Sequence, residues 1–226
     1  MTIDHEKPFF EPKKLGALFK WLKVFLLIYI ASELFITVGS LLSFQLGTIS
    51  FGYEYDFTFA DLIVSIGAVF LLISFFVTIV LFCIFSFRSA KNLKNWNVRE
   101  FETSPGWAVG WYFIPIANLW KPYGVMDQIW SGSQAILSKT TSAPSYMGVW
   151  WACWIISNIV SNLSFRLGLE AGVFDDVVSN LPLYKATLVM DAVSGVLGIL
   201  AAYYLLKLTK TIAGNQDSYI NSMAFE

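Results

Sequence analysis

Four long apolar segments alternate with polar segments along the chain, and this alternation predicts the fold. The apolar segments cover residues 21–44, 62–87, 147–165 and 186–208. A helix needs about 20 predominantly apolar residues to cross the hydrocarbon core of a bilayer, and each segment is close to that length. The pattern therefore predicts an all-α integral membrane protein with four transmembrane helices, and we expect residues 1–226 to form a single membrane domain.

The first two apolar segments have particular features. A secretory signal peptide has an apolar stretch of about 7–15 residues before its cleavage site, so residues 21–44 are too long for one and should remain as a helix. Residues 62–87 carry no charge and continue directly into the polar sequence RSAKNLKNW. We expect one continuous helix there, which tilts or extends out of the bilayer.

The lysines and arginines are distributed unevenly between the two sides that these helices define. Only Arg166 and Lys185 fall in the two short connections. The other thirteen of the 15 are Lys7, Lys13, Lys14, Lys20, Lys23, Arg88, Lys91, Lys94, Arg99, Lys121, Lys139, Lys207 and Lys210. Because cytoplasmic segments are enriched in Lys and Arg, both termini and the long segment between the second and third helices should be cytoplasmic.

Residues 104–123, SPGWAVGWYFIPIANLWKPY, are too apolar for an ordinary loop and too interrupted by proline to span a bilayer. A crossing here would also invert the last two helices and place the basic residues after the fourth helix outside. We therefore expect a broken helix on the cytoplasmic side, either re-entrant or lying in the interface. Ser104 should cap it and Pro105 should be its first helical residue. Pro115 should break it.

Beyond Pro122 the pattern becomes that of an amphipathic helix, so the interfacial motif as a whole covers residues 104–138. Apolar positions recur at helical spacing and should share one face, with polar positions opposite. The apolar set is Val125, Met126, Ile129, Trp130, Ile136 and Leu137, and the polar set is Asp127, Gln128, Ser131 and Gln134. Such a helix lies in the membrane plane or packs beneath the helix bundle.

Composition narrows the chemistry. Charged residues make up 14% of the chain, against about 25% in soluble domains, and the net charge of −1 gives no basic face for nucleic acid. Cys83, Cys153 and His5 cannot build a disulfide framework or a Cys/His metal site, and we interpret both cysteines as packing residues. No nucleophile–base pair is present either. We therefore expect no metal, no cofactor and no catalytic residue, which favours a non-enzymatic protein.

Two acidic residues lie within the apolar segments. Glu33 shares a helix face with Tyr29, Thr37 and Ser40, and Asp191 lies about one turn inside the outer end of the fourth segment. Carboxyl groups at such depth usually face the bundle and often mark a pathway. One hypothesis is a proton- or cation-linked pair. The alternative is a neutral Glu33 bonded to the third helix, with Asp191 in water near the interface.

Small and polar residues also gather on the last two apolar segments. Ser157, Asn158, Ser161 and Asn162 form a polar face on the third, and Ser194, Gly198 and Ala202 form a small-residue face on the fourth. Such faces more often serve helix packing than ligand binding.

The remaining candidates for ligand binding surround the interfacial motif. They are Arg88, Asn92, Trp107, Trp111, Asn118, Trp120, Lys121 and Tyr123. Aromatic residues gather at the headgroup level of any membrane protein, but an interface anchor does not need a proline-broken helix with an asparagine at the break. We expect Arg88 and the start of this helix to contact an anionic lipid headgroup, with Trp107 and Trp111 against an acyl chain. The alternative is that Arg88 bonds Asn118 or a nearby carbonyl and fastens the motif.

At these residues the chain resembles a family of multi-pass bacterial membrane proteins catalogued only as a domain of unknown function. The features that match are Arg88 with Asn92, residues 104–123, residues 126–130 and the pair Trp150 and Trp151. The resemblance implies a protein of the bacterial cytoplasmic membrane, but it carries over no reaction and no catalytic residue. Residues 124–127 depart from the longer polar or acidic pattern of the family.

Three functions are compatible with the sequence. The first is a non-enzymatic membrane protein whose cytoplasmic motif binds a partner or a lipid headgroup. The second is a small permease that uses Glu33 and Asp191, and the third is a lipid-acting enzyme in which Asp127 would be the acid–base group. Membrane lipid is the expected partner, with another membrane protein or a second copy of the chain as alternatives.

Overall fold

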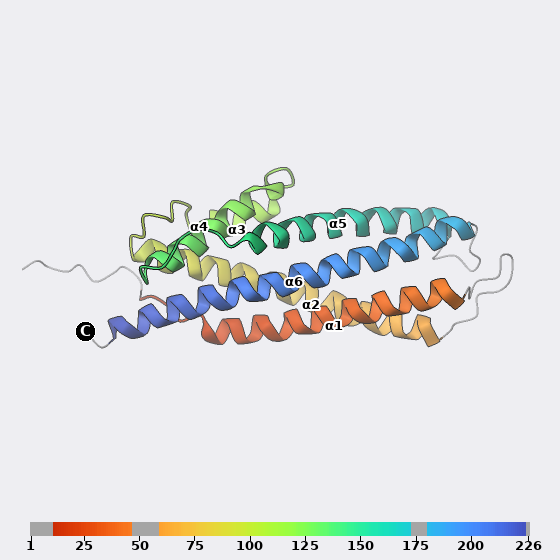
Figure 1. The fold of residues 1–226 in the computed structure, drawn as a ribbon, viewed down its shortest axis with the longest axis horizontal. Coiled ribbons are helices and arrows are strands. Elements are labelled where there is room, and N and C mark those ends of the chain that lie inside the picture. The colour runs from red at the N-terminus through yellow and green to blue at the C-terminus, as the bar shows by residue number, and fades with distance from the viewer. Residues whose placement is uncertain (1–10, 47–58, 173–179, 225–226) are drawn as a thin grey trace, which may run out of the picture. The chain divides into compact units, whose positions relative to one another are not determined.

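The computed structural model describes residues 11–46, 59–172 and 180–224, and these residues form helices and loops without a strand (Figure 1). His5, Lys7 and residues 47–58 and 173–179 of the two short connections lie outside the described residues. The elements are α1 (Gly16–Leu46), α2 (Phe59–Asn95), α3 (Trp107–Gly110), η1 (Trp111–Phe113), η2 (Ala117–Leu119), α4 (Lys121–Ala135), α5 (Ser145–Ala171) and α6 (Leu181–Met223). The predicted all-α class is confirmed.

Three of the four predicted transmembrane segments lie in helices that are long and apolar enough to cross a membrane. These spans are Gly16–Leu42 in α1, Leu62–Asn95 in α2 and Leu181–Met223, which is the whole of α6. Helix α5 has 27 residues and is as long as the α1 span, but its serines, asparagines and tryptophans lower its hydropathy. The described chain therefore contains three candidate spans, and the fourth remains a prediction.

The observed helices extend beyond the predicted segments. Helix α2 continues through the polar sequence after Phe87 to Asn95, as predicted. Helix α6 begins at Leu181 and ends at Met223, so it extends beyond the predicted transmembrane segment 186–208 at both ends. No proline occurs between Pro182 and Met223, so nothing in the backbone stops the helix when the sequence turns polar.

The chain divides into two compact units. Unit 1 comprises residues 11–23, 78–148 and 206–224, and unit 2 comprises the described residues within 24–77 and 149–205. Each of the four long helices contributes one part of its length to each unit. Helix α5 gives only its first four residues, 145–148, to unit 1.

Unit 2 is held together by close approaches at small residues. A Cβ added to Gly195 or Gly198 of α6 would meet side chains of α1, and one added to Gly67 of α2 would lie 3.3 Å from the Ser32 carbonyl oxygen. Helices α5 and α6 lie side by side, and the Ser157 hydroxyl donates to the Ser194 carbonyl at 2.9 Å (Figure 1). Small residues allow helices to pack closely where lipid surrounds them.

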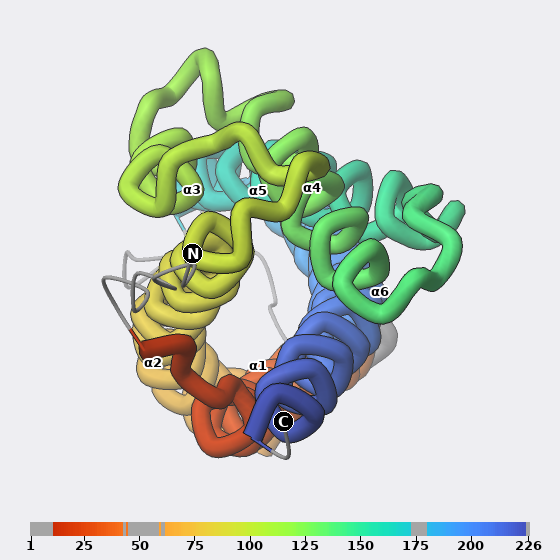
Figure 2. Tube along the Cα trace, turned by 90° about the vertical axis from the view of Figure 1, so that its left-hand side faces the viewer, coloured from red at the N-terminus to blue at the C-terminus, as the bar shows by residue number. Residues whose placement is uncertain are grey.

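Unit 1 is held together by buried polar side chains. Three consecutive residues of α6, Asn215, Gln216 and Asp217, each bond a different part of the unit. Asp217 accepts the backbone N–H groups of Leu15 at 2.7 Å and Gly16 at 2.8 Å. Figure 2 shows the N-terminal segment beside the C-terminal part of α6 as a result.

Candidate ligand-binding site

The interfacial motif is a series of short helical turns broken before proline. Helix α3 passes into η1, and then Ile114 takes an extended conformation with φ −98° and ψ 110°. A proline disfavours the helical conformation for the residue before it, so Pro115 ends the first part of the motif as predicted. Pro122 lies in the first turn of α4, where its missing N–H costs nothing.

Ser104 begins the motif in nearly the predicted way. Its hydroxyl accepts a hydrogen bond from the Trp107 N–H at 3.4 Å, and its carbonyl accepts one from the Ala108 N–H at 3.0 Å. The regular helix α3 itself begins at Trp107, two residues later than expected, and has only four residues.

One side of the motif is an exposed apolar surface. It is formed by Trp107, Phe113, Ile116, Leu119 and Trp120, which are all at least 50% exposed. The Trp107 and Trp111 rings stack with their centroids 4.4 Å apart, and the Lys121 ammonium lies 5.1 Å from the Trp111 ring centroid. So large an apolar surface needs an apolar environment, which the interfacial region of a bilayer would supply.

The opposite side of the motif packs inward. The Tyr112 ring contacts the Phe82 ring edge-on at 5.5 Å, and burial of its hydroxyl raises the pKa of Tyr112. In α4, Val125, Met126, Ile129 and Trp130 are buried as predicted.

Two details of the predicted amphipathic helix were wrong. Gln134 is buried rather than on the polar surface, because its Oε1 accepts a hydrogen bond from the Asn215 amide at 3.1 Å. Helix α4 also ends at Ala135, so Ile136 and Leu137 lie in the following turn and are not part of its apolar face.

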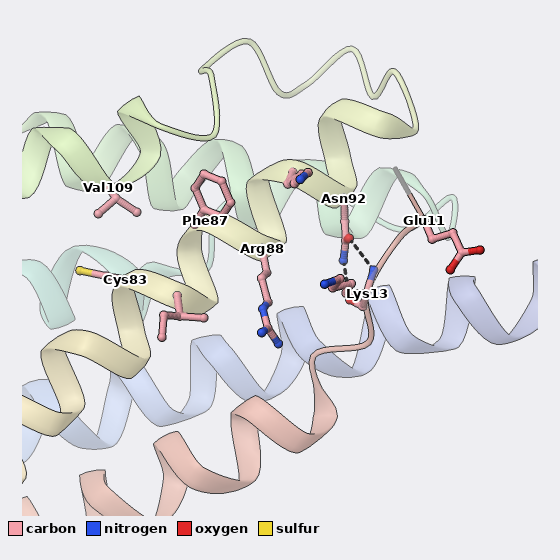
Figure 3. A pocket seen from close by; sticks show the side chains of 9 residues that line it. Glu11, Lys13, Cys83, Phe87, Arg88, Asn92 and Val109 are labelled. Atoms are coloured by element: carbon pink, nitrogen blue, oxygen red, sulfur yellow. Dashed lines mark hydrogen bonds between the residues drawn. The ribbon is translucent and has the colours of Figure 1, made fainter. Parts of the chain in front are cut away.

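A pocket of about 690 Å³ opens along one face of α2 in unit 1 (Figure 3). Its lining from α2 is Cys83, Ile84, Phe87, Arg88, Lys91 and Asn92, which recur at helical spacing, and Glu11, Lys13 and Val109 complete it. In Figure 3 Cys83 and Val109 lie toward one end, and Glu11 and Lys13 lie at the other. The pocket therefore has an apolar part and a charged part, within the size range of ordinary ligand sites.

Arg88 and Asn92, the two predicted site residues that line this pocket, have different roles in it. The Asn92 amide is fully used, since it donates to Gln216 Oε1 and to the Lys13 carbonyl at 2.9 Å each and accepts the Lys13 N–H at 3.0 Å. Arg88 is half-buried, and its guanidinium bonds nothing among the described residues. Asn92 therefore shapes the pocket, whereas Arg88 is available to a ligand.

The other predicted site residues lie elsewhere in the motif. Trp107, Trp111, Asn118, Trp120, Lys121 and Tyr123 do not line the pocket, and neither does Asp127. The Asn118 side-chain oxygen is buried without a hydrogen-bond partner among the described residues, so the expected alternative of an Arg88–Asn118 bond is wrong.

Sequence reasoning missed Glu11, Lys13, Cys83 and Val109 as neighbours of Arg88. Helical spacing around Arg88 could have identified Cys83, together with Phe87 and Lys91. The N-terminal residues Glu11 and Lys13 could not be found in this way, because the bonds from Asn92 to Lys13 bring them near.

Asp127 lies in α4, away from the pocket. Burial raises the pKa of Asp127, which faces no cationic partner in the described chain.

Unit 2 brings the two intramembrane acidic residues together. The Glu33 and Asp191 carboxyl groups are near enough to interact electrostatically, and the Ser164 hydroxyl donates to Asp191 Oδ1 at 2.6 Å. Of the predicted polar face of α5, Ser157 is buried while Asn158, Ser161 and Asn162 are exposed. Ser194, Gly198 and Ala202 of α6 are all buried, in agreement with a packing role.

These features define a class of helical proteins with long apolar helices and a broken aromatic motif. Within it, the chain belongs to the family described as "Domain of unknown function (DUF4328)", whose family model matches residues 52–214. This confirms the resemblance noted from the motif. The match includes Arg88, the motif and Asp191, and it leaves out Lys13, Glu33 and Asp217. Comparisons with curated proteins and with solved structures found no match to the chain.

Proposed function

We propose that this chain is a multi-pass membrane protein whose unit 1 pocket binds the anionic headgroup of a phospholipid. The observation that carries the proposal is Arg88, a half-buried cation with no bond to the described protein, in a pocket that is apolar on one side. Partly buried cations normally have a partner, and a phosphate group would supply one.

The lining of the pocket fits a phospholipid better than a small soluble anion. Lys13 and Lys91 lie with Arg88 in the charged part, and Cys83, Ile84 and Phe87 provide an apolar surface for the beginning of an acyl chain. Basic pockets at the cytoplasmic side are a known way of holding phospholipid headgroups. The exposed apolar surface of the motif would contact the same lipid layer.

The distribution of charge supports a cytoplasmic position for unit 1. Of the fourteen described Lys and Arg residues, twelve belong to unit 1, and only Arg166 and Lys185 belong to unit 2. If cytoplasmic segments carry the positive charge, the N-terminus, the motif and the C-terminus share the cytoplasmic side, and four spans follow. The bacterial cytoplasmic membrane is the proposed location.

Native mass spectrometry tests the lipid site. We expect Arg88→Gln to reduce retention of phosphatidylglycerol about tenfold, since it removes a charge-assisted contact, and to reduce retention of phosphatidylcholine less, since the choline ammonium offsets the phosphate charge. Arg99→Gln is the matched control, because Arg99 is exposed, belongs to the same unit and does not line the pocket. Equal phosphatidylglycerol retention in the two variants would contradict the proposal.

Cys83 offers a direct measure of pocket occupancy. In a Cys153→Ala background, phosphatidylglycerol should slow alkylation of Cys83, which lines the pocket, and this protection should disappear in Arg88→Gln. Protection that is equal in both backgrounds would show that Arg88 does not hold the lipid.

Cysteine labelling of intact cells tests the topology. Single cysteines replacing Tyr55 or Phe174 should be labelled from outside, and those replacing Asn95 or Ser138 should not. Labelling at Ser138 from outside would mean that the motif crosses the membrane, and the four-span topology would be wrong.

A further inference from the structure

Two carboxyl groups in unit 2 lie close together without a basic partner. The Tyr29 hydroxyl and the Glu33 carboxyl group both lie beside Gly198 of α6, and the Ser164 hydroxyl donates a hydrogen bond to Asp191 Oδ1 at 2.6 Å. The described part of unit 2 contains two basic residues, and neither pairs with these carboxyl groups. The Arg166 Nε donates to Asn162 Oδ1 at 3.1 Å, and Lys185 is exposed. Two nearby carboxylates in a poorly hydrated site repel each other, so a proton or another cation must neutralise part of their charge.

Thr37 supplies an independent observation that a ligand belongs at this place. Its side chain is only 7% exposed, and its hydroxyl has no hydrogen-bond partner among the described residues. A buried hydroxyl without a partner is unfavourable unless something absent from the protein chain satisfies it.

The glycines of α6 show where this hydroxyl points. A Cβ added to Gly195 would meet Thr37 Oγ1 and would lie 3.3 Å from Glu33 Oε2. A Cβ added to Gly198 would lie 2.9 Å from the Tyr29 hydroxyl and 3.3 Å from Glu33 Oε1. The oxygen atoms of Tyr29, Glu33 and Thr37 therefore gather along one narrow strip of α6, next to the helix face that carries Asp191.

We propose that Glu33 and Asp191, with the hydroxyls of Tyr29 and Thr37, bind one monovalent cation, either a proton or an alkali metal ion. All the donor atoms are oxygens, which suit hard cations and not thiophilic ones. The described residues contain no group of three or more His, Cys, Asp and Glu side chains, which a site for a divalent or transition metal would use. This site is independent of the lipid pocket, since all its residues belong to unit 2.

The groups that face the site from each neighbouring helix define its titration. Helix α1 contributes Tyr29 and Glu33, α6 contributes Asp191, and α5 contributes the hydroxyl of Ser164. A proton would be shared by the carboxyl groups, whereas an alkali ion would bind with both groups ionised. The two cases differ in whether a protonated carboxyl group is present at neutral pH.

Infrared spectroscopy and thermal unfolding of the purified full chain distinguish them. Proton binding should give a protonated-carboxyl C=O band at neutral pH that is lost in Glu33→Gln or Asp191→Asn. Binding of an alkali ion should give a higher melting temperature in sodium or potassium chloride than in choline chloride, and the same variants should abolish that difference. Glu170→Gln, which removes an exposed carboxylate of the same unit, should change neither result.

Thr37→Val keeps the test decisive if the carboxyl variants do not fold. Its hydroxyl bonds nothing in the described protein, so valine should preserve stability while cation binding weakens about 2–10-fold. A wild type with neither the carboxyl band nor a cation-dependent melting temperature would overturn the proposal. If the wild type shows the cation-dependent melting temperature, an unchanged dependence in Thr37→Val would overturn the site as assigned.

Discussion

Helix α6 meets its neighbours in two different ways along its length. In unit 2 its contacts are made by Ser194, Gly195 and Gly198, which bring neighbouring helices close. In unit 1 they are made by Asn215 and Gln216, whose amides bond side chains of α2 and α4 at 2.9–3.1 Å. One helix thus changes from close packing of small residues to a network of amides.

The difference agrees with the environments proposed for the two units. Where lipid surrounds a helix, burial of apolar surface gives no advantage between helices, and small residues with close backbones provide the packing. Next to water, a polar network can be assembled because every member finds a partner. The lysines and arginines are also concentrated in unit 1, the unit for which a position next to water is proposed.

The largest effect should come from Gln216→Leu. Gln216 is completely buried, and its amide bonds Asn92 at 2.9 Å, Ser133 at 2.9 Å and the Ser89 carbonyl at 3.4 Å. Leucine would leave several buried polar groups unsatisfied, so the free energy of unfolding should fall by about 2–4 kcal/mol and the melting temperature by about 5–15 °C.

Asn221→Leu is the control for this variant, because Asn221 is exposed on the same helix. It should leave the melting temperature nearly unchanged. If Gln216→Leu were as stable as Asn221→Leu, the amide network would not hold unit 1 together and the contrast between the units would fail.

Gly195→Ala should have the next largest effect, in unit 2. The new methyl group would meet Thr37 Oγ1 and Glu33 Oε2, so we expect a loss of about 1–3 kcal/mol in thermal unfolding. Gly214→Ala is the matched control on the same helix, since its methyl group would meet nothing within 4 Å. It should stabilise the helix by about 0.5–1 kcal/mol. Similar results for the two glycines would contradict close packing in unit 2.

The sequence predicted unit 2 better than unit 1. Apolar length and spacing define α1 and α2, and the small residues of α6 predicted its packing face. In unit 1 only local signals allowed predictions. Helical periodicity identified Val125, Met126, Ile129 and Trp130, because burial of one helix face leaves a local pattern. The break before Pro115 was predictable because proline restricts the residue that precedes it, which is also a local effect.

The network of unit 1 could not be predicted because its partners are far apart in the chain. Asn92 bonds Gln216, which is 124 residues away, and Asp217 bonds Leu15, which is 202 residues away. An Asn-Gln-Asp sequence in a polar tail has the same local pattern as a solvated helix end. Only the absence of a helix-stopping residue after Leu208 indicated that the helix continues. The pocket was partly missed because Lys13 depends on this network for its position.

Asp217→Ala should have a smaller effect than either core variant. Its carboxylate accepts the Leu15 and Gly16 N–H groups at the start of α1, and an acidic cap of this kind contributes about 0.5–2 kcal/mol. Asp217→Asn should recover part of the loss, since an amide oxygen can still accept. Thermal unfolding of the three proteins measures the difference, and equal stability of all three would show that the N-terminal segment is held without this cap.

The smallest effect should come from Asp127→Asn in unit 1, because Asp127 is partly exposed and, unlike Glu33 and Asp191 of unit 2, has no second carboxyl group of the described chain acting on it. Burial raises the pKa of Asp127 above its ordinary value of 3.8, and no hydrogen bond or ion pair compensates it in the described chain. The folded protein therefore binds this proton more tightly than the unfolded chain does, so stability increases as the pH falls through the raised pKa. At neutral pH the ionised carboxylate costs a little stability, and asparagine removes that cost.

Because Asp127 is partly exposed, the melting temperature of Asp127→Asn should rise by only about 1–2 °C, and this gain should disappear below about pH 3.8. The exposed Glu100→Gln is the control and should show no change. A melting temperature lowered by Asp127→Asn would mean that the carboxylate has a partner in the working protein, and the acid–base role considered for it in a lipid-acting enzyme would gain support.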